Sequence, residues 1–190
     1  MSGSDPVKPA EPDNSGEPAG SAGSLPPRSF GGRVFGALRL DPKVYTEIEH
    51  DPSSLGQAAI VVTLVAAAAG LGNSIADSPN LVILSIFTNL AAWAFSAAII
   101  WLVGVAWMGH DSAYPELLRT IGFATAPQGL YFFQGSEFGM YAFVLGLVWS
   151  LAAYVVAVRE TLDVTTGRAI GVCLLANGLV LLAVITLIDF

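Results

Sequence analysis

Residues 79–108 read PNLVILSIFTNLAAWAFSAAIIWLVGVAWM and contain no Asp, Glu, Lys, Arg or His. At about 1.5 Å per residue, a helix of this length would rise about 45 Å, whereas the hydrocarbon core of a bilayer is about 30 Å thick. No water-soluble fold needs a helix that is apolar on every side over such a distance. The stretch therefore predicts a transmembrane helix, and the other segments are placed relative to a membrane.

The composition of the chain agrees with a membrane protein. Of its 190 residues, 54% are hydrophobic and only 12% are charged, and the mean hydropathy is +0.64. Such values are typical of membrane proteins. The net charge of −7 argues against a nucleic-acid partner, which would require a basic patch. The single cysteine, Cys173, excludes a disulfide framework and a thiolate metal site.

Residues 1–29 are rich in Pro, Gly, Ser and acidic side chains. Such a segment buries too little apolar surface to offset the entropy lost on ordering, so we expect a disordered cytoplasmic tail. It lacks the apolar core of a signal peptide, and we expect the first membrane helix to insert the protein. A solubilising leader is the favoured interpretation, and a docking role is the alternative. Residues 30–190 are expected to form the membrane domain.

Residues 30–51 mix aromatic and aliphatic side chains with cations. Asp41-Pro42 is typical of an N-cap followed by proline at the first helical position, so a short amphipathic helix is expected after it. Two interpretations remain open for this segment. It lies on the membrane surface with its cations near lipid headgroups, or it packs as an ordinary short helix against the rest of the protein.

The remaining chain divides into five apolar spans, which predicts an all-α bundle of five transmembrane helices. The small residues of the run 66–70 favour close helix packing in the first span. Pro127 lies in the middle of the third span, where it removes a backbone hydrogen bond and predicts a helix kink. The five predicted spans are about 53–74, 79–108, 117–134, 139–158 and 169–188.

The cations predict the orientation of these spans. With five spans, all eight Lys and Arg residues fall on one side of the membrane. The positive-inside rule then places the N-terminus in the cytoplasm and the C-terminus outside, in the cytoplasmic (inner) membrane. Those nearest the spans are expected to contact lipid headgroups, namely Arg33, Arg39, Lys43, Arg119, Arg159 and Arg168.

The spans carry no ionisable residue at bilayer depth, where proton relays and ion sites would need one. No catalytic constellation, cofactor motif or cluster of metal ligands is visible, so we expect a non-enzymatic protein without cofactor or metal. Asn89, Gln128 and Asn177 are the intramembrane amides. Interhelical hydrogen bonding is the favoured interpretation for them, and a polar pocket or permeation path is the alternative.

Three stretches together resemble the Yip1 family of five-span membrane proteins. They are LRLDPKVYTEIEHDPSSLGQA (38–58), LLRTIGFATAP (117–127) and RETLDVTTGRAI (159–170), and the resemblance covers about 35–188. The motif DLYGP of eukaryotic members is absent, so the chain is more similar to prokaryotic members of this family.

The resemblance implies a non-enzymatic scaffold, interaction, membrane-organising or trafficking factor. Its expected partners are the lipid bilayer and either other membrane proteins or further copies of itself. A passive transporter or channel for a small neutral solute is the alternative function, suggested by the three intramembrane amides and the proline.

Overall fold

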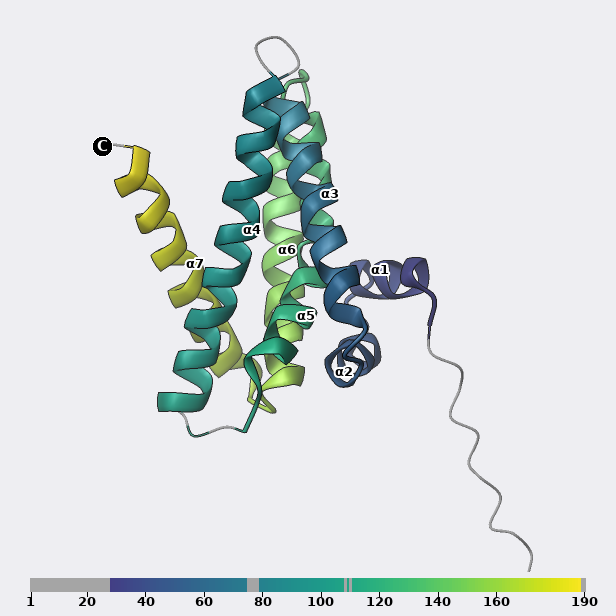
Figure 1. The fold of residues 1–190 in the computed structure, drawn as a ribbon, viewed down its shortest axis with the longest axis vertical. Helices are drawn as coiled ribbons and strands as arrows, with labels where there is room; N and C mark the ends of the chain where they lie inside the picture. The colour runs from purple at the N-terminus through teal and green to yellow at the C-terminus, as the bar shows by residue number, and fades with distance from the viewer. Residues whose placement is uncertain (1–27, 75–78, 108, 110, 189–190) are drawn as a thin grey trace, which may run out of the picture.

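The computed structural model describes residues 28–74, 79–107, 109 and 111–188 (Figure 1). This part of the chain consists of helices and connecting turns, with no strand in it. The all-α class predicted from the sequence is thus confirmed for the described residues. The predicted disordered tail, 1–29, lies outside them except for Arg28 and Ser29.

Four helices are long and apolar enough to cross a membrane, and they match four of the predicted spans. α4 is continued by a π-helical turn, η1 (Leu102–Trp107), so the two together cover the stretch that predicted a single long helix. Figure 1 shows α7 diverging from α4 toward the C-terminus. The four helices are α3 (Ser54–Ser74), α4 (Pro79–Trp101), α6 (Gly139–Thr161) and α7 (Thr166–Ile188).

The predicted third span is not one continuous α-helix. It consists of α5 (Tyr114–Ala124) followed by a 3₁₀ helix, η2 (Ala126–Phe133). Pro127 has no N–H to donate to the carbonyl that an α-helix would place four residues before it. The backbone tightens instead, and the N–H of Gln128 donates to the carbonyl of Thr125 at 2.8 Å. The structure therefore has a change of helix type where the sequence predicted a kink.

The α5–η2 segment runs along the bundle from one end to the other (Figure 1). Its first residue lies beside the second half of α4, because the Tyr114 hydroxyl donates to the Ala94 carbonyl at 3.0 Å. Its last residues lie beside the end of α3, where the carbonyl oxygens of Tyr131 and Phe132 contact Gly72. The segment thus covers the same height of the bundle as the long helices on either side of it.

Small residues bring α3 and α4 close together. The Cα of Val82 lies only 2.9 Å from the position that a Cβ would occupy on Gly70. The Ser85 hydroxyl donates to the Ala66 carbonyl at 3.0 Å. The close approach predicted for the run 66–70 is therefore confirmed.

Two short helices, α1 (Phe30–Leu38) and α2 (Pro42–His50), precede the bundle. Asp41 caps α2 as predicted, since its side chain accepts a hydrogen bond from the N–H of Lys43 at 3.1 Å. Val44 and Tyr45 are fully buried against the protein. The Trp149 indole of α6 donates to a backbone carbonyl at the end of α1 at 2.9 Å. The apolar face of α2 is thus turned toward the bundle, as the second interpretation predicted, whereas Phe30 and Phe35 of α1 are exposed.

We predict that Gly72→Ala destabilises the protein. A methyl group at this position would collide with the backbone of η2, lying 2.7 Å from the Phe132 carbonyl oxygen. Because backbone cannot rotate away as a flexible side chain does, the helices must move apart, which costs about 1–3 kcal/mol for overpacking. Thermal unfolding of the purified protein in detergent measures the effect.

Gly56→Ala is the matched control. Gly56 is an exposed glycine in the same helix, and a Cβ there would meet no neighbour. The alanine is expected to be neutral or to stabilise α3 by up to about 1 kcal/mol through its higher helix propensity. Equal melting temperatures for the Gly72→Ala protein and the unmodified protein would show that α3 and η2 are not in tight contact.

Candidate functional site

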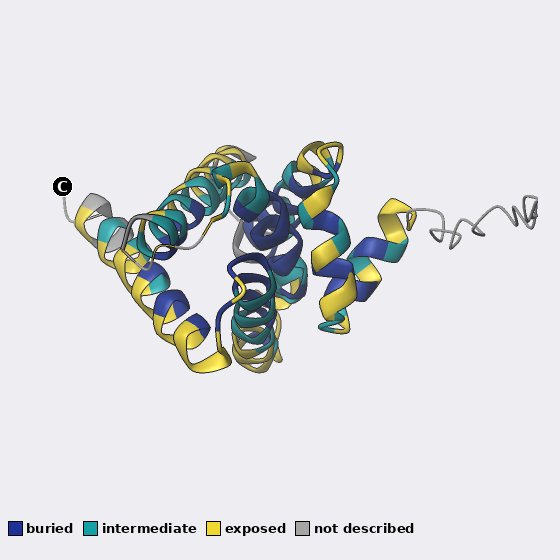
Figure 2. Ribbon diagram, turned by 90° about the horizontal axis from the view of Figure 1, so that it is seen from below, coloured by how far each residue is buried: buried dark blue, intermediate teal, exposed yellow. Residues whose placement is uncertain are grey.

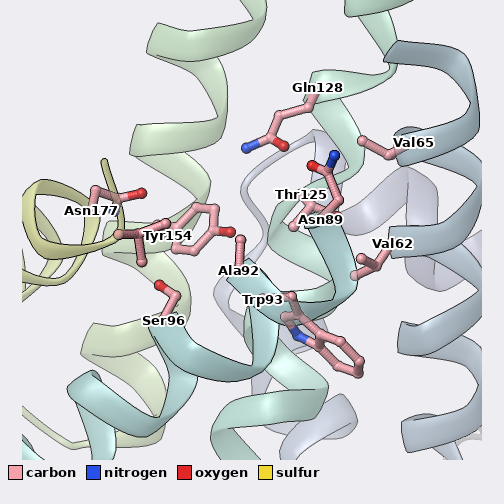
Figure 3. A pocket seen from close by; sticks show the side chains of 11 residues that line it. Val62, Val65, Asn89, Ala92, Trp93, Ser96, Thr125, Gln128, Tyr154 and Asn177 are labelled. Carbon is pink, nitrogen blue, oxygen red and sulfur yellow. The ribbon is translucent and has the colours of Figure 1, made fainter. Parts of the chain in front are cut away.

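The three intramembrane amides singled out in the sequence converge on one cavity. Asn89 of α4, Gln128 of η2 and Asn177 of α7 line a space of about 160 Å³ (Figure 3). These residues are far apart in the sequence, and each lies near the middle of its pass through the bundle. We call this space the polar cavity.

The amides hold their positions through their own helices. The Asn89 amide donates to the Ser85 carbonyl at 2.9 Å, and the Asn177 amide donates to the Cys173 carbonyl at 2.8 Å. Both acceptors lie one turn earlier in the same helix, so neither bond joins two helices. Figure 3 shows the Gln128, Asn89 and Asn177 side chains turned toward the space between the helices. Of the two interpretations, the arrangement matches the polar pocket.

Four further side chains with polar atoms line the cavity and were not predicted from the sequence. Ser96 is only 4% exposed, and its hydroxyl has no hydrogen-bond partner. Its spacing of seven residues from Asn89 places both on one face of α4, a signal that could have identified it. Trp93 follows Asn89 by four residues on the same helix, so this spacing could have identified it too. No such pattern links Tyr154 of α6 to lining residues on other elements, which is why it was missed. The four residues are Trp93, Ser96, Thr125 and Tyr154.

The chemistry of the polar cavity is that of neutral hydrogen bonding. Its lining offers amide, hydroxyl and indole groups but no charged side chain. A polar cavity of this size has room for several water molecules or for one small neutral group. Within the described part of the chain, no three His, Cys, Asp or Glu side chains are close enough to hold a metal ion.

Arg33, one of the six predicted headgroup cations, is buried within the protein. It is 2% exposed and pairs with Glu47 at 3.0 Å and Asp51 at 2.6 Å. It also donates to the side-chain oxygen of Gln57 at 3.2 Å. Burial opposes its charge, but the hydrogen bonds to Asp51 and Glu47 prevail and raise the pKa of Arg33. Arg33 therefore joins α1 to α2 and to the start of α3.

The other five cations differ in exposure. Arg119 is 8% exposed and donates to the backbone carbonyl of Glu49, so it joins α5 to α2. Arg159 is half-buried beside Glu160. Contact with lipid headgroups stays a prediction for this set. The exposed members, whose guanidinium or ammonium groups are most accessible, are Arg39, Lys43 and Arg168.

Glu49 lies where α2, α5 and the turn after α6 meet. Burial is the main cause that raises the pKa of Glu49, to about 7, and the nearby carboxylates of Glu116 and Asp163 act in the same direction. The charges of His50 and Arg119 oppose this rise without cancelling it. The docked state of α2 therefore favours the protonated Glu49.

We predict that α2 docks less firmly as the pH rises. A carboxyl whose folded pKa is raised stabilises the folded state below its unfolded pKa, and this contribution is lost as the pH passes through the folded pKa. For Glu49 the window runs from its ordinary pKa of 4.5 up to a folded pKa of about 7. Amide hydrogen exchange in residues 42–50, corrected for intrinsic rates, should show lower protection above this window than below it.

Glu49→Gln should remove this dependence on pH, because glutamine does not titrate. Glu137→Gln, at an exposed carboxylate in the turn before α6, is the control and should leave the dependence intact. Unchanged pH dependence in the Glu49→Gln protein would assign the effect to another group.

Comparison with known proteins supports the assignment suggested by the sequence. A family model described as Yip1 domain matches residues 35–188. Searches of curated proteins and of solved structures found no match. The matched region includes α2 to α7 and therefore every residue that lines the polar cavity. Because the match covers most of the chain, the protein belongs to the Yip1 domain family.

Proposed function

We propose that this Yip1-family membrane protein is a non-enzymatic scaffold that associates with further copies of itself through the outer face of α7. The observation that carries this proposal is a row of open glycines on that helix. A Cβ added at Gly167, Gly171 or Gly178 would meet no other atom of the described residues within 4 Å. Their spacing of four and seven residues places them on one face of the helix.

A glycine inside a helix lowers the stability of the helix by up to about 1 kcal/mol relative to alanine. A row of such glycines therefore needs a structural explanation. Packing among the described residues does not explain Gly171 and Gly178, because the space beside them is open. In lipid, small residues favour helix association because the backbones can approach closely. A two-fold symmetric pair would bring the same glycine face of each copy together.

The weak packing of α7 against its own bundle supports the proposal. Only 22% of its membrane-spanning window is buried, compared with 44% for α3. Figure 2 shows the helix that ends at the C mark at the edge of the bundle, with a largely exposed outer surface. Self-association would cover that surface.

The proposal includes five membrane crossings, with the N-terminus in the cytoplasm and the C-terminus outside. The full-height course of α5–η2 supports a crossing there although it is not one long helix (Figure 1). Arg159 lies in the last turn of α6 and Arg168 in the first turn of α7, so this crossing keeps both on the same side as Arg33, as the positive-inside rule favours.

Passive passage of a small neutral solute is a second candidate function, favoured by the polar cavity of about 160 Å³. We place it second because the lining residues lie in the middle part of the four long helices and at the junction of α5 with η2, so that this lining reaches neither end of the bundle. Flux of a neutral solute into liposomes that contain the protein tests it. Flux that Gln128→Leu removes would favour this second function.

We predict that Gly171→Leu and Gly178→Leu weaken association. Leucine on this face would hold two α7 helices apart, which removes the close backbone contact that favours pairing. Energy transfer between differently labelled copies of the full chain in liposomes measures the association, and both variants should lower it at equal protein density.

Gly56→Leu is the control, since it enlarges an exposed helical glycine on α3 instead. It should leave the energy transfer unchanged. A strictly monomeric unmodified protein in liposomes would contradict the proposal, as would equal energy transfer in all three variants.

A further inference from the structure

We propose that the polar cavity and an apolar groove beside it form one binding site for a neutral amphiphile. The ligand would carry a hydroxyl or carbonyl head and a single hydrocarbon chain. This inference goes beyond the scaffold function and does not depend on it. Val180 and Ala183, which line the groove, are partly buried, whereas the open glycines of α7 are exposed. The two surfaces therefore belong to different sides of that helix.

The groove lies between α4 and α7 and has a volume of about 790 Å³. Phe87, Ala91 and Phe95 line it on α4, and most of its other lining is also apolar. Ala92 and Val180 line both the groove and the polar cavity. The two spaces therefore adjoin, one offering hydrogen bonds and the other hydrocarbon contact.

The Ser96 hydroxyl, which has no hydrogen-bond partner among the described residues, indicates the chemistry of the head. The Ser96 hydroxyl is buried without a partner, and such a group costs about 1–3 kcal/mol unless a ligand or water satisfies it. Ser96, Tyr154 and Gln128 line the same cavity from three elements (Figure 3). Hydroxyls and amide N–H groups can donate to a hydroxyl or carbonyl oxygen.

A charged head is disfavoured. No charged side chain lines the cavity, and an ion taken out of water without a partner is very costly. The apolar lining of the groove suits a hydrocarbon chain, which could enter from the surrounding lipid. A neutral head joined to such a chain matches both parts of the site.

A second groove provides an internal control. It lies between α6 and α7, has a volume of about 390 Å³, and is lined by Ala152, Ile170 and Leu174 among other apolar residues. None of its lining residues also lines the polar cavity. A hydrocarbon without a polar head should bind both grooves alike, whereas a long-chain alcohol should prefer the groove between α4 and α7.

The experiment uses the full chain in phosphatidylcholine nanodiscs and three photoreactive probes with the same tail. They are a hexadecanol, a hexadecane and an ionised palmitate, each with a diazirine in its chain. We expect the hexadecanol probe to label α4 and α7 beside Phe87, Phe95 and Ala183 more strongly than the second groove. The hexadecane probe should label both grooves alike, and palmitate should show no preference for the first.

Substitutions test each part of the site. Ser96→Ala and Gln128→Leu should each lower hexadecanol labelling of the first groove about fivefold, which corresponds to one hydrogen bond of about 1 kcal/mol. Ala92→Phe should block the junction and remove the preference for this groove. Ala152→Phe, in the second groove, should leave it intact. Melting temperatures identify the variants that are folded. If Gln128→Leu unfolds the protein, labelling of the Ser96→Ala protein, which carries a smaller change, tests the polar cavity.

Two results would overturn the proposal. One is equal labelling of the first groove by the hexadecanol and palmitate probes, since the head would then contribute no selectivity. The other is undiminished hexadecanol labelling in folded Ser96→Ala and Ala92→Phe proteins, because the polar cavity would then hold water and not the head of a ligand.

Discussion

Backbone N–H and C=O groups at bilayer depth have no water to bond with, so a segment that leaves the α-helix there must be enclosed by protein. The backbone of α5–η2 lies between α3 and α6 and is contacted from both, although the side chains of Phe132 and Phe133 at its end are exposed. Gly72 contacts it from one side, and Gly146 from the other, where a Cβ would lie 2.9 Å from the Tyr131 ring. The small residues on both sides let the neighbouring helices approach the 3₁₀ backbone closely.

This enclosure accounts for the positions of the other elements. Because the broken segment packs against α3, α7 lies on the far side of the bundle, where it packs mainly along α4 and α6 and keeps its glycine face open. η2 directs Gln128 into the middle of the bundle, where Asn89 and Asn177 approach from other helices. Both proposals therefore depend on the α5–η2 segment. It contributes to the polar cavity proposed to bind a ligand, and it leaves α7 on the outside, where association is proposed.

Hydropathy predicted the boundaries of the long helices well, because lipid requires long uncharged segments. Asp41-Pro42 predicted the start of α2, because an N-cap followed by proline favours a helix start both at a membrane surface and within a protein. Two features depended on tertiary contacts instead. An amphipathic segment has the same pattern whether it faces lipid or protein, so the surroundings of α2 stayed open until Val44 and Tyr45 were found buried. Pro127 predicted an interruption, but the type of helix after it depends on neighbours such as Gly72. The cavity residues on separate elements, such as Tyr154, share no spacing that a sequence reveals.

Cysteine accessibility tests the five-crossing account most directly. Single cysteines at Ser112, Ser136 and Thr165, in a Cys173→Ala background, are treated with an impermeant thiol reagent in intact cells or spheroplasts. If α5–η2 crosses the membrane, the Ser136→Cys protein reacts from outside, while the Ser112→Cys and Thr165→Cys proteins react only after permeabilisation. Reaction of the Thr165→Cys protein from outside, with Ser112→Cys still protected, would show that α5–η2 does not cross and would contradict the account.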